Sequence, residues 1–374
     1  MEYKYKKRGT SFKPLLGAFA IVAGVFGGYY TAAGLDSVKS PPKISSPLTP
    51  KVQTERKQTL EDIINSSQKI ITKSTYEINY FDSFGNEVKK EIPLYSFGSS
   101  ICIYKNLDEK NLFFLTCDHV TTAPEEMYVI GDLSSFKKVE KNLYETKLKT
   151  KNKEDSFYVL LEENKPFDFG IFIHLAKLKS VSLGIYQETI KDEHGEITDF
   201  KTIPLTELAD TNFKDDDPDW VKNNDISLLK VDTSKMNDLE IFSNLNKFSV
   251  WDGKWADYAS MKQGDLLKVV GYPSAFERQI NSGELTSKEG IEKSLNNNFY
   301  FTSAHLNPGN SGGPVFLVRE TYKIVNNQVV KEQEFYFAGL ARLGAGGEGL
   351  GGILRPDIIE KFLIEQGYGY LIKK

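Results

Sequence analysis

Short apolar runs of strand length, each followed by a turn, recur from Tyr76 to about Leu343, and this pattern constrains the fold most. The runs 77–81 and 88–92, for example, flank a polar turn at 83–86. The chain has 374 residues, 40% of them hydrophobic, which is enough for a large core. The pattern therefore predicts an all-β body built of barrels.

Residues 307–314 read Asn-Pro-Gly-Asn-Ser-Gly-Gly-Pro between two strand-like runs. Glycine reaches backbone conformations that other residues avoid, so the amides of Gly309 and Ser311 can converge on a developing oxyanion. Gly312 leaves the hydroxyl of Ser311 uncrowded, as an acyl-transfer nucleophile requires. The same residues also make ordinary turns, so the assignment needs catalytic partners elsewhere in the chain.

A serine nucleophile needs an imidazole to take its proton and a carboxylate to orient that imidazole. Of four histidines, His174 lies in an apolar run, His194 in a polar turn, and His305 six residues before Ser311. His119 ends an apolar segment, where an imidazole can face a cleft without burying an unsatisfied nitrogen. The alternative for His119 is a structural histidine with a satisfied hydrogen bond.

Two aspartates are candidates for the carboxylate of the site. Asp168 and Asp225 each begin a β-like run, and the residues around them leave the choice open.

Three motifs together carry a resemblance to a known family. They are Thr-Cys-Asp-His-Val at 116–120, Asp-Ile-Ser-Leu-Leu-Lys-Val at 225–231, and the serine turn at 307–314. In this order they resemble the chymotrypsin-like serine endopeptidases, and among them the disulfide-poor HtrA/Deg type. The likeness runs from about Gly98 to Leu363, apart from an insertion at roughly 138–218, and the chain is expected to lack the PDZ module of many HtrA-type proteins.

The resemblance implies two six-stranded antiparallel β-barrels, a C-terminal helix, and an active cleft between the barrels. Segments from 262 to 285 match the family's stretch between aspartate and serine, which favours Asp225 and leaves Asp168 in reserve. The expected triad is His119, Asp225 and Ser311. The expected oxyanion hole is formed by Gly309, Asn310 and Ser311, and the chemistry needs no metal or organic cofactor.

Substrate specificity follows from the same alignment. It places His305 at the floor of the primary specificity pocket and Arg342 on the strand that lines it. Two cations there would favour an acidic side chain before the cut. The alternative is that His305 is a hydrogen-bonded core residue and Arg342 points to solvent.

The N-terminus predicts export. A basic tail at 1–13 precedes an uncharged stretch at 14–35, long enough to cross a bilayer as a signal anchor, with a cleaved signal peptide as the alternative. The positive flank stays cytoplasmic, which places the protease domain (59–374) outside the cytoplasm beyond a Pro/Ser linker at 36–58. Ala20, Gly24, Gly28 and Ala32 form a small-residue face that would suit a homo-oligomer.

Charge and cysteine content limit the possible partners of the chain and the expected state of its thiols. A net charge of −4 argues against a nucleic-acid surface, so the expected partners are protein or peptide substrates and the membrane. In a hairpin of the two apolar segments that hold the cysteines, Cys102 faces Phe114, so we expect two free, buried thiols. Two rival functions are a tethered pseudoprotease or chaperone-like binding module and a structural surface protein with an accidental glycine turn.

Two helices are also predicted. One begins after the N-cap Thr59 and carries Leu60, Ile63, Ile64 and Ile71. The other opens at Pro356 and stops at Gly367.

Overall fold

The computed structural model describes most of the chain from residue 58 onward. The described residues are 4–7, 10–12, 58–81, 87–106, 108–132, 137–140, 143–149, 154–160, 171–211, 224–237, 243, 246–273, 277–288, 298–325, 328–344 and 351–372. The predicted anchor at 14–35, almost all of the linker, and the reserve aspartate Asp168 lie outside them. Among the described residues, no helix is both long and apolar enough to span a bilayer.

The chain divides into two compact units. Unit 1 comprises Met1–Val22, Lys73–Tyr95 and Ala123–Val181. Unit 2 comprises Ala23–Thr72, Ser96–Thr122 and Ser182–Lys374. Every residue of the expected triad, oxyanion hole and specificity pocket belongs to unit 2, so the site is described within that unit alone.

Unit 1 holds a five-stranded antiparallel sheet in the order β2-β1-β9-β8-β7. Its strands are β1 (Lys4–Lys7), β2 (Thr10–Phe12), β7 (Lys137–Glu140), β8 (Leu143–Lys149) and β9 (Glu154–Leu160). The sequence did not predict this sheet. Lys4 of the expected cytoplasmic tail pairs with Leu160, and the location of the tail stays a prediction.

A seven-stranded sheet has the order β11-β12-β5-β4-β3-β10-β6, with a further pairing between β10 and β11. Its strands are β3 (Ser67–Phe81), β4 (Glu87–Asn106), β5 (Asn111–Thr116), β6 (Glu126–Asp132), β10 (Ile171–Lys191), β11 (Ile197–Asp210) and β12 (Ser227–Val231). The apolar runs 171–175 and 181–186 are parts of one strand, β10. Lys177 and Lys179 between them are exposed, and alternating polar residues continue a strand on its solvent face.

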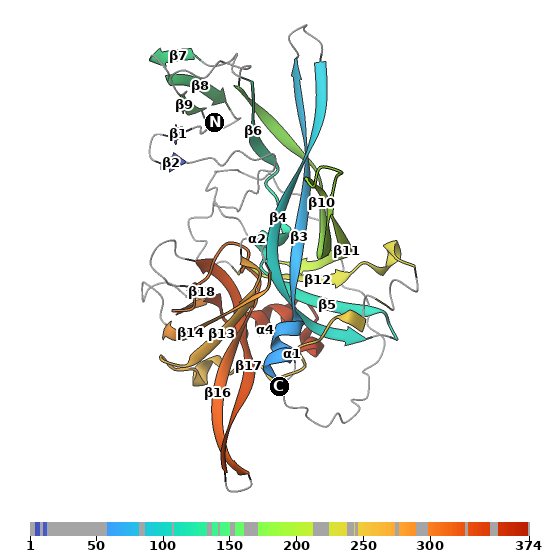
Figure 1. The fold of residues 1–374 in the computed structure, drawn as a ribbon, viewed down its shortest axis with the longest axis vertical. Coiled ribbons are helices and arrows are strands. Elements are labelled where there is room, and N and C mark those ends of the chain that lie inside the picture. The colour runs from blue at the N-terminus through green and yellow to red at the C-terminus, as the bar shows by residue number, and fades with distance from the viewer. Residues whose placement is uncertain are drawn as a thin grey trace. The chain divides into compact units, whose positions relative to one another are not determined.

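The C-terminal strands form a closed barrel in the order β13-β14-β15-β18-β17-β16 (Figure 1). They are β13 (Leu266–Gly271), β14 (Gln279–Ser287), β15 (Phe299–Thr302), β16 (Pro314–Val325), β17 (Gln328–Gly344) and β18 (Gly351–Leu354). The prediction of a mainly antiparallel β fold with a six-stranded C-terminal barrel is confirmed. The N-terminal sheet has one strand more than the predicted six.

The helices are short and lie at the ends of the strands. α1 (Leu60–Ser66) begins with the predicted cap, in which Thr59 and Asp62 each accept a backbone N–H of the other. It ends before Ile71, which lies in β3, so the predicted length was wrong. α4 (Pro356–Glu365) begins at the predicted proline. The remaining helical segments are α2 (Asp118–Thr121), η1 (Thr233–Lys235), η2 (Tyr258–Ser260) and η4 (Gly369–Leu371).

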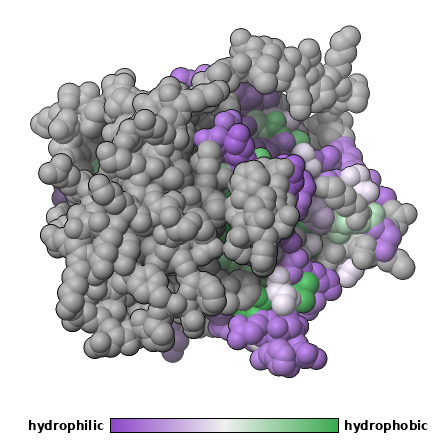
Figure 2. Space-filling model, turned by 90° about the horizontal axis from the view of Figure 1, so that it is seen from above, coloured by the Kyte–Doolittle hydropathy of each residue, from purple (hydrophilic) through white to green (hydrophobic). Residues whose placement is uncertain are grey.

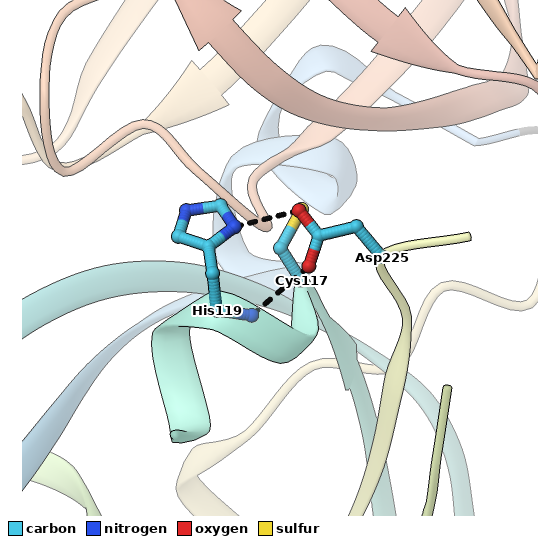
Figure 3. A group of neighbouring side chains, drawn as sticks. All are labelled: Cys117, His119 and Asp225. Carbon is cyan, nitrogen blue, oxygen red and sulfur yellow. Dashed lines mark hydrogen bonds and ion pairs between the residues drawn. The ribbon is translucent and has the colours of Figure 1, made fainter. Parts of the chain in front are cut away.

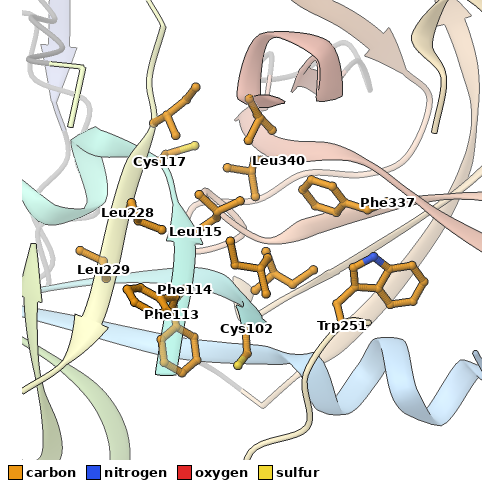
Figure 4. Close-up of a cluster of buried hydrophobic side chains, with 14 of the residues drawn as sticks. Cys102, Phe113, Phe114, Leu115, Cys117, Leu228, Leu229, Trp251, Phe337 and Leu340 are labelled. Carbon is orange, nitrogen blue, oxygen red and sulfur yellow. The ribbon is translucent and has the colours of Figure 1, made fainter. Parts of the chain in front are cut away.

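The core of unit 2 joins its sheet to the barrel through one cluster of buried side chains (Figure 4). Trp251 is 2% exposed, and its ring centroid lies 4.8 Å from that of Phe316 on β16. Burial of each such aromatic side chain stabilises the fold by about 1.5–3 kcal/mol. Cys102 pairs with Phe114 as predicted, and both cysteines are free and buried.

Hydrophilic side chains predominate among the described residues on the face shown in Figure 2. Exposed large apolar side chains gather elsewhere, on the long β16–β17 hairpin, where Tyr322 is 65%, Ile324 77% and Val329 71% exposed. Val325 of β16 pairs with Gln328 of β17 at the end of this hairpin.

Candidate active site

His119 lies in α2, the single helical turn that follows β5, rather than at a strand end as predicted. Its Nδ1 lies 2.6 Å from Oδ2 of Asp225, and its backbone N–H donates to Oδ1 of the same carboxylate at 2.9 Å (Figure 3). With Nδ1 as the donor, Nε2 of the neutral ring is an acceptor. The side chain of His119 is 31% exposed.

The position of Asp225 follows from strand pairing. β12 pairs antiparallel with β5, and Ser227 lies opposite Thr116, so the residues before β12 lie beside those after β5. The segment is fixed from its other side, because the Thr211 hydroxyl donates to the Asn224 carbonyl at 2.7 Å. Pairing of two strands more than a hundred residues apart therefore brings His119 and Asp225 together.

Asp225 is fully buried, and its carboxylate is also held by an arginine. Nε of Arg342, on β17, donates to Oδ2 of Asp225 at 2.6 Å, and the guanidinium lies 4.7 Å from the centre of the Phe299 ring. Burial alone would raise the pKa of Asp225, but His119 and Arg342 outweigh it and hold that pKa below its usual range. The carboxylate is therefore ionised at neutral pH.

Ser311 lies in a turn that hydrogen bonds fix to β4. The backbone N–H of Ser99 donates to the carbonyl of Ser311 at 2.8 Å, and the Ser99 hydroxyl donates to the carbonyl of Gly309 at 2.7 Å. Gly309 has φ 96° and Gly312 has φ 78°, both in the region that favours glycine. A Cβ on Gly312 would lie 2.1 Å from Oγ1 of Thr116, so close packing also requires glycine there.

The three amides of the predicted oxyanion hole differ in their hydrogen bonds. In the described part of the chain, the amides of Gly309 and Ser311 donate to no backbone carbonyl, and an oxyanion hole requires such available donors. The amide of Asn310 donates to the carbonyl of Asn307 at 3.0 Å, and Asn310 is 2% exposed. The Asn310 amide is thus already bonded within the turn, and the oxyanion hole stays a prediction.

The Ser311 hydroxyl donates to the backbone carbonyl of Arg342 at 3.1 Å. Ser311 is partly exposed. Ser311 and the His119–Asp225 pair thus share one neighbour, Arg342, which contacts the serine through its backbone and the aspartate through its side chain.

The two predicted specificity residues lie in different environments. The side chain of His305 is exposed, and its carbonyl accepts a hydrogen bond from Asn281 at 2.7 Å. Arg342 is 5% exposed, and its charge is paired with Asp225. The alternatives of a core His305 and a solvent-facing Arg342 are therefore wrong, and only His305 offers an exposed side chain to a substrate.

Donor atoms of Cys117, His119 and Asp225 lie within 4.8 Å of one another, a spacing that a metal ion could use (Figure 3). Burial raises the pKa of the Cys117 thiol well above its ordinary value, which opposes the thiolate form that metals prefer. The guanidinium of Arg342 at the carboxylate opposes a second cation. The arrangement suits an acid–base pair better than a cation site.

Sequence reasoning missed the role of Arg342 at the aspartate and that of Ser99 at the serine turn. A charged side chain between Ala341 and Leu343, in an apolar strand, signals burial and hence a buried partner. The sequence offers no comparable signal for Ser99.

Comparisons with known proteins agree with this geometry. Residues 185–322 match the family described as trypsin-like peptidase domain, a range that contains Asp225 and Ser311 but not His119. This stretch of the chain is therefore similar to a trypsin-like peptidase domain. A probable periplasmic serine endoprotease DegP-like of Pseudomonas putida is 27% identical over 109 residues, covering 28% of this chain and 19% of that protein.

A second curated protein and a solved structure also match parts of this chain. A protein of Hahella chejuensis with the same description is 30% identical over 112 residues, covering 29% of this chain and 20% of its own. This chain therefore spans about a fifth of the length of the curated relatives that it matches. The solved HtrA-type protease AlgW with decapeptide is 12% identical, covers 83% of this chain and 67% of its own, and has a TM-score of 0.40.

Proposed function

We propose that the trypsin-like domain is a serine endopeptidase with the triad His119, Asp225 and Ser311. Oγ of Ser311 attacks the carbonyl carbon of the scissile peptide bond, and Nε2 of His119 takes the hydroxyl proton. The same proton passes to the leaving amine as the C–N bond breaks, which leaves an acyl-enzyme on Ser311. A water molecule, deprotonated by His119, then hydrolyses the ester and restores the serine.

The hydrogen-bonded pair of His119 and Asp225, beside a glycine turn with two available amides, carries this proposal. The buried carboxylate holds the proton of His119 on Nδ1, which keeps Nε2 as the base. The Gly309 and Ser311 amides would stabilise the tetrahedral oxyanion. The approach of Ser311 Oγ to His119 belongs to the proposal, because in the structure this hydroxyl donates to the Arg342 carbonyl.

The substrates and cellular location are also proposals. The periplasmic relatives and the basic, apolar N-terminus support a protease domain outside the cytoplasm that acts on proteins or peptides. Membrane attachment through residues 14–35 and self-association rest on the sequence alone. A preference for an acidic residue before the cut now depends on His305, since the charge of Arg342 is paired with Asp225.

A fluorophosphonate probe, which labels an activated serine, tests the function directly. We expect the wild-type chain to be labelled and Ser311→Ala to be unlabelled, with casein cleavage falling roughly a millionfold, as in another serine protease without its nucleophile. Labelling of neither protein would support the rival binding module instead. Equal cleavage by both proteins would show that Ser311 is not the nucleophile.

A further inference from the structure

Arg342 forms a buried ion pair with the carboxylate that orients the general base. Its side chain is 2% exposed and that of Asp225 is 0% exposed, so water screens this pair little. Oδ2 of Asp225 accepts Nε of Arg342 and Nδ1 of His119, each at 2.6 Å. The negative charge of Asp225, which would stabilise a protonated His119, therefore also interacts with the permanent positive charge of Arg342.

The fold places Arg342 there through an irregularity of β17. Ala341 pairs with Ile353 and Leu343 with Gly352 of β18, so Arg342 falls at the register shift between the two pairs. Such bulges re-aim a side chain relative to the strand. The guanidinium packs against the Phe299 ring at 4.7 Å, and the backbone carbonyl accepts the Ser311 hydroxyl.

We propose that Arg342 is a positioning residue that aligns Asp225 with His119 and sets the pH at which His119 takes up a proton. This inference deepens the proposed function and rests on it for its catalytic meaning. A cation on the far side of the carboxylate disfavours the imidazolium, so the free base persists to lower pH. An opposite or like charge within roughly 6 Å shifts a pKa by about one to three units.

Other titratable groups lie close to this pair in the sequence or the fold. Cys117 and Asp118 precede His119, and Glu207 on β11 accepts the Thr121 and Ser227 hydroxyls at 2.8 and 2.5 Å. Burial keeps the Cys117 thiol protonated and thus uncharged. Asp118 and Glu207 are unchanged by substitution of Arg342, so a difference between variants reports the guanidinium itself.

Proton NMR of the imidazole C–H groups tests the proposal without turnover. All proteins carry Ser311→Ala, and the exposed His194 and His305 serve as internal references. Arg342→Met removes the charge, and we expect the pKa of His119 to rise by about one to two units. Arg342→Lys keeps a charge, and we expect a smaller shift. An unchanged His119 titration in folded Arg342→Met would overturn the proposal.

A second variant and a control keep the test decisive. Should Arg342→Met fail to fold, Arg342→Gln has no charge but retains a donor, and the same rise is expected. Arg319→Met removes the ion pair between Arg319 and Asp265, where the arginine side chain is 37% exposed, and should leave His119 unchanged. If Arg319→Met shifts the pKa of His119 as much as Arg342→Met does, the role assigned to Arg342 is overturned.

Catalysis is tested separately with Ser311 intact. We expect Arg342→Met to move the acid limb of the kcat/KM profile to higher pH by the same amount as the NMR pKa. A His119 shift in a protein that the fluorophosphonate probe never labels would support the role of Arg342 and reject the proposed peptidase. A labelled, active Arg342→Met with an unmoved acid limb would reject the role of Arg342 alone.

Discussion

Asp225 remains ionised without any exposed surface because hydrogen-bond donors hold both oxygens of its carboxylate. Oδ1 accepts the backbone N–H of His119, and Oδ2 accepts His119 and Arg342. Its folded pKa therefore lies below the unfolded value of about 3.9. The ionised form stabilises the fold above about pH 4, and this contribution is lost as the pH falls toward the folded pKa.

Asp225→Asn should destabilise the protein by about 3 kcal/mol at pH 7, because it leaves a buried Arg342 without its counter-charge. The deficit should shrink as the pH falls from 4 to 3, because the carboxylate of the unfolded wild-type chain takes up a proton there while that of the folded protein stays ionised. Urea unfolding at both pH values measures it. Asp265→Asn, which breaks the more exposed pair with Arg319, is the matched control and should cost about 1 kcal/mol or less.

At the scale of elements, β4 holds the serine turn in place through one residue. Ser99 is fully buried; besides its two bonds to the turn, its Oγ accepts the backbone N–H of Tyr272 at 3.0 Å. Its own carbonyl accepts the Thr116 hydroxyl at 2.7 Å, which joins β4, β5 and the turn. The conformation of residues 309–311 is thus set by a strand two hundred residues away.

Ser99→Ala should lower stability by about 1–3 kcal/mol, because it leaves the Gly309 carbonyl and the Tyr272 amide without their partner. We expect kcat to fall more than KM rises, since the change loosens the oxyanion donors and leaves binding surfaces intact. Thermal unfolding and steady-state kinetics measure the two effects. Ser260→Ala, at an exposed 3-10 turn, should change neither.

At the scale of the whole molecule, unit 2 encloses both cysteines in its core. Cys102 and Cys117 have no exposed surface, and burial raises the pKa of each thiol. Cys117 lies two residues from His119, so its burial shows that the core is tightly packed next to the candidate site. Its thiol donates to the Ala341 carbonyl at 3.4 Å.

Both thiols should resist the disulfide reagent DTNB at pH 8 in the native protein and react as two equivalents in urea. Because reaction requires opening of the core, the rate should follow unfolding. Rapid reaction of one thiol under native conditions would show that the core opens locally, and Cys117→Ala would identify which thiol it is.

Several local features of this structure could be predicted from the sequence. The cap of Thr59 and Asp62, the Pro356 start of α4 and the glycine turn at Ser311 depend on neighbours within a few residues, so they can be read from the sequence. The identity of His119 and Asp225 as candidates came from motif order. Their hydrogen bond depends on the pairing of β5 with β12.

Long-range packing decided the rest. The ion pair of Arg342 with Asp225 and the anchoring of the serine turn by Ser99 join residues far apart in the chain. The continuity of β10 depends on which face of the strand is buried. The amide of Asn310 shows the same limit on a smaller scale, because only the folded turn determines which N–H groups are already bonded. Residue types and their order specified the chemical groups available to this chain. Strand register and burial decided which of those groups meet, because contact energies depend on distance in space, which sequence separation does not encode.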